Sequence, residues 1–215
     1  MNEPEPEFSS PACFPHELAD GPAGEISGQD PAEALEDLRL WRKAKREALI
    51  AKRLALPPEA RTTASAEITD RLLALLAFSQ QRVGFYSPVR GEYDPWPLAR
   101  SLEASGVPLA LPVVIAKAQP MIFRAWRPGT KMVPGVWQIP VPADGDPVQP
   151  DTLLVPLVGF DANRYRLGYG GGFYDRTIAA MPQRPRTIGV GFLCGQLRSI
   201  HPRPYDIPMD EIVAA

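Results

Sequence analysis

Residues 166–175 carry the side chains best suited to chemistry. Glycine stands at positions 168, 170, 171 and 172, after a buried apolar strand (residues 153–158) and a polar turn, and before a helix-compatible run (residues 173–181). Glycines at such a point let the backbone approach a ligand closely and turn its N–H groups toward it. With the N-terminus of the following helix they form a cradle for an anion. The segment therefore predicts a phosphate-binding loop.

Charged residues flank these glycines. Arg166 can pair with a phosphate, and Asp175 can hold a Mg²⁺ ion bound to that phosphate. Two commoner nucleotide-binding motifs do not match. A Walker A loop ends in Gly-Lys-Ser/Thr, but here Gly172 is followed by Phe173. A dinucleotide-binding fingerprint needs its third glycine at position 173, which is also Phe173. A glycine-rich surface turn with a capping aspartate remains the alternative interpretation.

Charge is distributed unevenly along the chain. Residues 1–37 hold ten of the 25 acids and no Lys or Arg, so the rest carries 23 bases against 15 acids, a net charge of +8. A basic body suits an anionic ligand, such as a nucleotide or a polycarboxylate, without choosing between them. A helix expected from Pro31 to the Pro57-Pro58 pair, with Asp30 as its cap, places Arg42, Arg46 and Arg53 on one face. A merely solvated basic face is the alternative.

Apolar periodicity predicts the elements that position these residues. Further helices are expected over residues 59–78, 95–105 and 173–181, and strands over residues 82–86, 107–114, 121–126, 153–158 and 187–192. In the first of these helices, Ile68, Leu72, Leu75 and Leu76 form the stripe expected to face the core. Helices alternating with apolar strands predict a three-layer α/β fold, an open, mostly parallel sheet with helices on both faces.

Composition narrows the class of protein. Hydrophobic content of 45% and charged content of 22% are globular values. Cys13, Cys194, His16 and His201 are too few and too scattered for a zinc site or a disulfide framework, which favours a reduced, cytoplasmic setting. We find no secretory start and no apolar run of membrane length. Residues 1–32 are predicted to be a flexible acidic Pro/Gly-rich extension, with a docking tail as the alternative, and residues 33–215 a single catalytic domain.

The glycine segment also resembles the signature sequence of a known enzyme family. Residues 166–176, which read Arg-Leu-Gly-Tyr-Gly-Gly-Gly-Phe-Tyr-Asp-Arg, resemble the signature of the 5-formyltetrahydrofolate cyclo-ligase family, and residues 156–161 are similar to the strand before it. The resemblance extends from about residue 38 to residue 212. It implies a CoA-transferase-like α/β fold and an enzyme that closes 5-formyltetrahydrofolate to 5,10-methenyltetrahydrofolate with ATP and Mg²⁺. The expected partners are ATP and the reduced folate, and we expect a monomer with neither a membrane nor a nucleic acid as partner.

The resemblance assigns a role to each matching residue. It implies that Mg²⁺ is held by Asp175 and Asp206, the latter in the closing motif of residues 205–210. It implies that the substrate is bound by Tyr86, Glu92, Trp137 and Tyr174, with a free surface Glu92 and a core Trp137 as the alternatives. It implies that ATP is bound by Arg42, Arg46, Arg166, Leu167, Gly168, Tyr169, Gly170, Gly171, Gly172, Phe173 and Tyr174.

A few positions depart from the family pattern. Gln138 and Val141 stand where Gly and Glu are frequent, Arg203 where Glu is common, and Phe173 where the first tyrosine of a Tyr-Tyr-Asp triplet is usual. These departures leave the phosphate and metal positions intact and put the substrate contacts in question. Two rival functions follow: a paralogue with the same nucleotide site and another substrate, or a regulator that binds nucleotide or folate without catalysis and uses the basic helix on nucleic acid.

Overall fold

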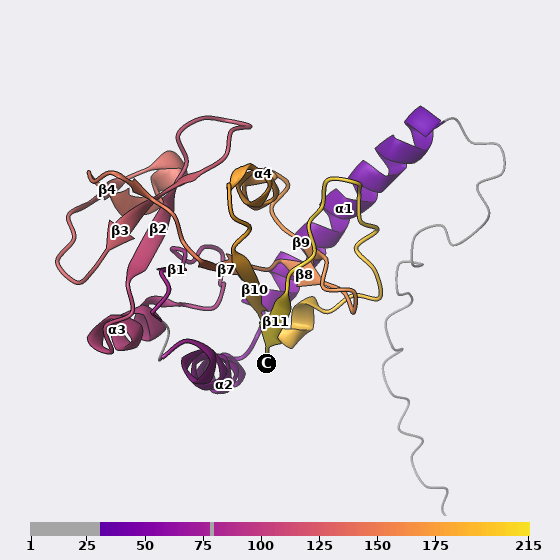
Figure 1. The fold of residues 1–215 in the computed structure, drawn as a ribbon. Coiled ribbons are helices and arrows are strands. Elements are labelled where there is room, and N and C mark those ends of the chain that lie inside the picture. The colour runs from indigo at the N-terminus through magenta and orange to yellow at the C-terminus, as the bar shows by residue number, and fades with distance from the viewer. Residues whose placement is uncertain (1–30, 78–79) are drawn as a thin grey trace, which may run out of the picture. The chain divides into compact units, whose positions relative to one another are not determined.

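The structure is a computed structural model that describes residues 31–77 and 80–215 (Figure 1). It divides the chain into two compact units, residues 1–41 and residues 42–215. In the first unit, residues 31–41 begin helix α1 (Pro31–Leu54), where Arg39 pairs with Glu36 at 2.6 Å. The predicted start of this helix is confirmed. Asp30, the rest of the predicted extension through residue 30, Cys13, His16 and Phe78 lie outside the described residues, and the domain boundary at residue 33 stays a prediction.

A seven-stranded sheet organises residues 42–215. Its strands, in spatial order, are β11 (Glu211–Ala214), β10 (Arg186–Gly191), β7 (Thr152–Pro156), β1 (Val83–Gly84), β2 (Leu109–Val113), β3 (Ile122–Trp126) and β6 (Pro147–Val148). The first five run parallel, whereas β3 and β6 join the β2 edge antiparallel. The mostly parallel sheet predicted from the sequence is therefore confirmed. The strand at the C-terminus, β11, was not predicted.

Helices cover both faces of this sheet, as the three-layer prediction requires. Helices α2 (Pro58–Leu76) and α3 (Trp96–Ala104) pack on one face, where Ile68, Leu72 and Leu98 are fully buried. Helix α4 (Phe173–Ala180) packs on the other face, where Ile178 contacts the cluster around Phe123 and Leu153. Figure 1 shows α2 and α3 together on the side of the sheet opposite α4.

Two local expectations fail. Leu75 was expected in the core, yet it is 36% exposed, because Ile68, Leu72 and Leu76 at spacings of four residues already line the face that meets the sheet. The strand expected over residues 82–86 is only Val83–Gly84, although Phe85 still donates its N–H to the carbonyl of Ala110 at 3.0 Å.

Smaller elements lie outside the main sheet. β4 (Met132–Pro134) and β5 (Pro140–Pro142) form one hairpin around the short 3-10 turn η1 (Val136–Gln138), and β8 (Gly159–Phe160) pairs with β9 (Arg166–Leu167). A second 3-10 turn, η2 (Leu193–Gly195), follows β10. The β8–β9 hairpin carries the glycine loop.

Candidate functional site

The glycine loop stands on a firmly held hairpin. The turn between β8 and β9 is organised by Asp161, which is 2% exposed. Its Oδ1 accepts the backbone N–H groups of Asn163 at 3.0 Å and Tyr165 at 3.1 Å, and its Oδ2 accepts that of Ile200 at 3.0 Å. Leu167 at the loop's start is fully buried in a cluster with Ile200. Of the residues predicted to bind ATP, Leu167 can therefore offer only its backbone.

The loop itself needs glycine at two positions for conformational reasons. Gly170 has φ +95° and Gly172 has φ +63°, both in the left-handed region, and Gly172 caps α4. A β-carbon on Gly170 would also lie 3.4 Å from Cζ of Arg46, whose Nε donates to the carbonyl of Gly168 at 2.7 Å. The predicted phosphate loop is thus formed with an arginine side chain packed along it.

Arg166 precedes this loop in β9, Asp175 follows it in the first turn of α4, and their side chains meet. The two side chains pair at 2.9 Å, and the Arg166 side chain is only 5% exposed. Arg166 also donates to the carbonyl of Ile207, whose own N–H donates to Asp175 Oδ1 at 3.1 Å. The ring of Tyr174 lies with its centroid 5.8 Å from the Arg166 guanidinium. The loop, the first turn of α4 and the segment at Ile207 are therefore joined by one buried ion pair.

A second buried pair lies between Arg42 and Asp206. Arg42 donates to Asp206 Oδ2 at 2.8 Å, and the backbone N–H of Arg203 donates to the same oxygen at 2.7 Å. Burial lowers the pKa of Arg46, and the neighbouring charges of Arg42 and Arg203 lower it further, with Asp206 opposing them. The Nε atoms of Arg42 and Arg203 are buried and lack a hydrogen-bond partner within residues 42–215. Arg42 is thus paired with Asp206, while the charges of Arg42 and Arg203 both act on Arg46, which leaves an excess of positive charge beside the glycine loop.

Two of the residues predicted to bind the substrate, Tyr86 and Tyr174, lie near a third, Glu92. This residue is 8% exposed, and its Oε2 accepts the Val89 N–H at 2.9 Å while its Oε1 accepts the Tyr169 hydroxyl at 2.8 Å. Burial raises the pKa of Glu92, and these two hydrogen bonds oppose the rise. The pKa values of Tyr86 and Tyr174 are also raised, in each case by burial first and then by the nearby Glu92 charge. Glu92 is therefore a buried carboxylate and not the free surface residue that the sequence left as an alternative.

Tyr86, also predicted to bind the substrate, is buried beside Glu92. It is 3% exposed, and its hydroxyl donates to the carbonyl of Tyr93 at 3.2 Å, so it belongs to the wall of this region. Tyr169 was assigned to ATP binding, and its backbone does lie in the glycine loop. Its hydroxyl, however, reaches Glu92. Tyr169 therefore joins the predicted nucleotide side to the predicted substrate side.

Trp137 lies on the surface. It is 69% exposed and has φ +56°, followed by Gln138 with φ +62°, within the turn that joins β4 and β5. Its ring meets Phe173 edge to face with centroids 5.8 Å apart. The alternative of a core tryptophan is excluded. Val141, in contrast, is 8% exposed and packs behind this turn.

The donor atoms present fit a magnesium ion that arrives with a phosphate. Mg²⁺ is commonly held by one or two carboxylates together with phosphate oxygens and water. The segments that carry Asp175 and Asp206 are in contact, because Ile207, the residue after Asp206, donates its N–H to the Asp175 carboxylate. Across residues 31–77 and 80–215, no cluster of three or more His, Cys, Asp or Glu side chains could hold an ion by itself.

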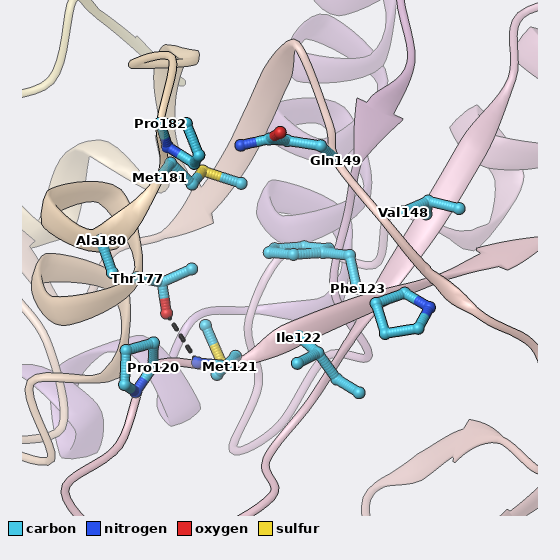
Figure 2. Close-up of a pocket in the computed structure, with 11 residues that line it drawn as sticks. Pro120, Met121, Ile122, Phe123, Val148, Gln149, Thr177, Ala180, Met181 and Pro182 are labelled. Atoms are coloured by element: carbon cyan, nitrogen blue, oxygen red, sulfur yellow. Dashed lines mark hydrogen bonds between the residues drawn. The ribbon is translucent and has the colours of Figure 1, made fainter.

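An apolar pocket of about 300 Å³ lies apart from these charged groups, between α4 and the β3–β6 edge. Figure 2 shows Met121, Phe123, Val148 and Met181 around it, with the Thr177 hydroxyl accepting the Met121 N–H at 2.9 Å. The Thr177 hydroxyl also donates to the Phe173 carbonyl, so its hydrogen-bonding capacity is used. The pocket therefore offers packing surface without a reactive group.

Three contributors were not predicted as site residues. Arg53 shares the helix face of Arg42 and Arg46, a signal that the spacing contained, and it is 4% exposed with its guanidinium on Tyr169. Asp161 gave only a generic turn signal. Arg203 was noted as a departure from the family pattern, and the structure brings it beside Arg46. None of the helices in the described part of the chain has the length and apolar character needed to cross a membrane.

Comparison with solved structures agrees with this fold. The solved structure of Aquifex aeolicus 5,10-methenyltetrahydrofolate synthetase matches with a TM-score of 0.71 and 28% identity, covering 80% of this chain and 89% of that one. The corresponding Mycoplasma pneumoniae structure has a TM-score of 0.66 at 23% identity, covering 80% and 97%, and supports the fold.

Sequence comparison gives the family. The Escherichia coli K12 5-formyltetrahydrofolate cyclo-ligase is 31% identical over 171 residues, covering 75% of this chain and 93% of that protein. The Mycolicibacterium smegmatis protein of the same name is 31% identical over 180 residues, covering 78% and 90%. The sequence model of the 5-formyltetrahydrofolate cyclo-ligase family matches residues 39–215. Because this family model covers most of the chain and the relatives are 31% identical to it, the chain belongs to the 5-formyltetrahydrofolate cyclo-ligase family.

Proposed function

We propose that this protein uses ATP and Mg²⁺ to cyclise 5-formyltetrahydrofolate to 5,10-methenyltetrahydrofolate. The observation that carries the proposal is the excess of positive charge beside the glycine loop, where Arg46 follows the loop and the charges of Arg42 and Arg203 act on it, with Asp206 opposing them. An arrangement of this kind attracts a polyanion, and the triphosphate of ATP is the polyanion that the resemblance of the glycine segment to the family's signature implies.

The chemistry follows from the poor leaving ability of a formyl oxygen. That oxygen attacks the γ-phosphorus of ATP as the bond from phosphorus to the departing ADP oxygen breaks, which gives an iminium phosphate on the folate. The neighbouring folate nitrogen then adds to the activated carbon and loses its proton. The carbon–oxygen bond breaks with departure of inorganic phosphate, which leaves the methenyl bridge.

The protein's part is to hold and orient the two substrates. Arg42, Arg46 and Arg166, with the N–H groups of residues 168–172, would bind the triphosphate and stabilise the charge that moves between its oxygens. Asp175 and Asp206 would hold Mg²⁺, which when bound neutralises phosphate charge. Because these groups are already fixed by hydrogen bonds, little reorganisation is needed when the phosphoryl group transfers.

The substrate side would use Glu92 to accept hydrogen bonds from the pterin ring. Phe173 and Trp137 provide an exposed aromatic surface next to the loop, suited to packing against a flat ring. Tyr174, which lies between Glu92 and Arg166, would border both substrates.

The test is a spectrophotometric assay of the purified full chain with 5-formyltetrahydrofolate, ATP and Mg²⁺. We expect methenyltetrahydrofolate absorbance to rise only when all three are present. The matched control is Asp175→Asn, which we expect to abolish the rise. Absence of any rise with the wild-type chain, at saturating substrates, would overturn the proposal.

A second candidate keeps the nucleotide site and changes the substrate. It is favoured by two residues of the β4–β5 hairpin. Gln138 has a left-handed backbone conformation that favours glycine, the residue frequent there in the family. Val141 is a buried apolar residue at a position where the family frequently has Glu. A panel of formyl-folates and other small carboxamide-like acids, assayed for ADP release, separates the two. ADP release with another acid and none with 5-formyltetrahydrofolate would select this candidate.

A further inference from the structure

Arg53 is a buried cation that the proposed chemistry does not use. The residue is 4% exposed, and all three guanidinium nitrogens donate hydrogen bonds. Nε donates to the carbonyl of Arg90 at 3.1 Å, Nη1 to the carbonyl of Leu157 at 3.0 Å, and Nη2 to the hydroxyl of Tyr169 at 2.8 Å. The three acceptors lie in the turn before Glu92, at the end of β7 and in the glycine loop. Arg53 thus binds together three segments that are far apart in the sequence.

The direction of the hydrogen bonds around Tyr169 is fixed by chemistry. The Tyr169 hydroxyl lies 2.8 Å from Arg53 Nη2 and 2.8 Å from Glu92 Oε1. A guanidinium can only donate, so the hydroxyl oxygen must accept from Arg53 and its single proton is available for Glu92. The result is a one-way chain from Arg53 through Tyr169 to the Glu92 carboxylate.

These hydrogen bonds end on Glu92, a carboxylate whose ionised form is disfavoured by burial. Four ionisable groups face Glu92, namely Arg53 from α1, Tyr86 from the segment after β1, Tyr169 from the glycine loop and Tyr174 from α4. Burial raises the pKa of Glu92, whereas the Tyr169 hydrogen bond and the Arg53 charge lower it. Without the Tyr169 hydrogen bond and the Arg53 charge, the ionised form of Glu92 would be less stable in this environment.

We infer that Arg53 and Tyr169 are positioning residues that orient the ionised Glu92 carboxylate and tie it to the glycine loop. The inference rests on the proposed function, in which the loop binds ATP and Glu92 binds the folate. It goes further in making the two sites one mechanical unit. A nucleotide that orders the loop also orders the Tyr169 hydroxyl, so ATP tightens folate binding, and by linkage folate tightens ATP binding to the same degree.

The decisive variant is Tyr169→Phe, which removes one oxygen from a side chain that is 40% exposed. The matched control is Tyr93→Phe. It removes a hydroxyl that makes an equally short hydrogen bond of 2.8 Å to Thr69 and takes no part in the Arg53–Tyr169–Glu92 hydrogen bonds. In both variants the Glu92 pKa is measured by ¹³C NMR titration of carboxyl-labelled glutamate, with Glu92→Gln to assign the signal. We expect the pKa of Glu92 to rise in Tyr169→Phe and to stay at its wild-type value in Tyr93→Phe.

The second measurement is calorimetry of 5-formyltetrahydrofolate binding with and without Mg²⁺ and a non-hydrolysable ATP analogue. We expect the analogue to tighten folate binding about fivefold or more in the wild-type chain, within the usual range of coupling between sites, and to have almost no effect in Tyr169→Phe. Arg53→Lys keeps the charge but loses the three-way contact, and we expect it to behave as Tyr169→Phe does.

The outcomes separate the proposed function from the positioning role of Arg53 and Tyr169. A wild-type chain that binds neither the analogue nor 5-formyltetrahydrofolate would overturn the proposed function, while the NMR titration would still test the chain of hydrogen bonds. A wild-type chain that binds both, with the same coupling and the same Glu92 pKa in Tyr169→Phe, would overturn the positioning role alone.

Discussion

Arginine reaches carboxylate in two different ways within residues 42–215. At the end of the glycine loop, Arg166 and Arg42 touch Asp175 and Asp206 directly, at 2.9 and 2.8 Å. At Glu92 the arginine is one step removed, because Arg53 touches only the Tyr169 hydroxyl and that hydroxyl touches the carboxylate. All three acids are largely buried, so exposure does not account for the difference.

The difference matches what each region would have to do. Carboxylates that hold a cation beside phosphates must stay charged, and direct contact with a guanidinium favours the charged form. A carboxylate that recognises a folate ring must leave its oxygens accessible to ring N–H donors, and a bound guanidinium would compete for them. An intervening hydroxyl gives orientation and partial charge support while it occupies one lone pair of one oxygen.

The largest effect should come from breaking a direct pair. We expect Arg42→Met to lower the free energy of unfolding by about 3–5 kcal/mol, because it leaves the Asp206 carboxylate buried without its partner. Urea denaturation measures this loss. The matched control is Arg184→Met, whose pair with Asp210 has side chains 55% and 40% exposed and should be worth about 0–1 kcal/mol. Equal losses in the two variants would contradict the distinction between buried and exposed pairs.

Removing charge from Asp175 should affect turnover most. We expect Asp175→Asn to lower kcat about a hundredfold or more, the usual cost of losing a charged contact that strengthens in the transition state. The fold should persist, since an amide oxygen can still accept the N–H of Ile207. Arg166→Ala should lower kcat to a similar extent. Steady-state kinetics together with thermal unfolding measure both effects, and full activity in either variant would remove these residues from the site.

Changing Glu92 should instead affect substrate affinity. We expect Glu92→Gln to raise KM for 5-formyltetrahydrofolate by about tenfold or more, because a hydrogen bond to a charged group is lost and an amide N–H₂ would face the Val89 N–H or the Tyr169 hydroxyl. The value of kcat should change little. A drop in kcat at unchanged KM would place Glu92 with the phosphate groups and erase the contrast between the two regions.

The smallest effect should appear in the pH dependence of stability. Because the folded protein raises the pKa of Glu92, the native state binds more protons than the unfolded state between the ordinary glutamate pKa and the raised native value. The free energy of unfolding should therefore fall as pH rises through that window. Urea titrations at a series of pH values should show this slope in the wild-type chain and a weaker one in Glu92→Gln. An identical slope in both would show that Glu92 is not the group responsible.

Much of this architecture was readable from local sequence. The glycine loop, α4 after it, α1 from Pro31 and the strands β2, β3, β7 and β10 were expected near their observed positions. Period, proline and glycine act over a few residues, so they identify such elements without knowledge of the rest of the chain. The strand β11 was missed because its pairing with β10 depends on where the chain returns, and its four residues carry little periodicity of their own.

Side-chain direction was decided by tertiary structure. The sequence placed Arg42, Arg46 and Arg53 on one helix face, but it could not say that one meets Asp206, one follows the glycine loop and one is buried against Tyr169. Each of these contacts joins residues more than 100 positions apart. Helix periodicity determines which side chains share a face of the helix. It does not determine their partners, which the folded sheet and its loops bring to that face. These partners make one arginine part of an ion pair, one a support of the glycine loop and one a positioning group.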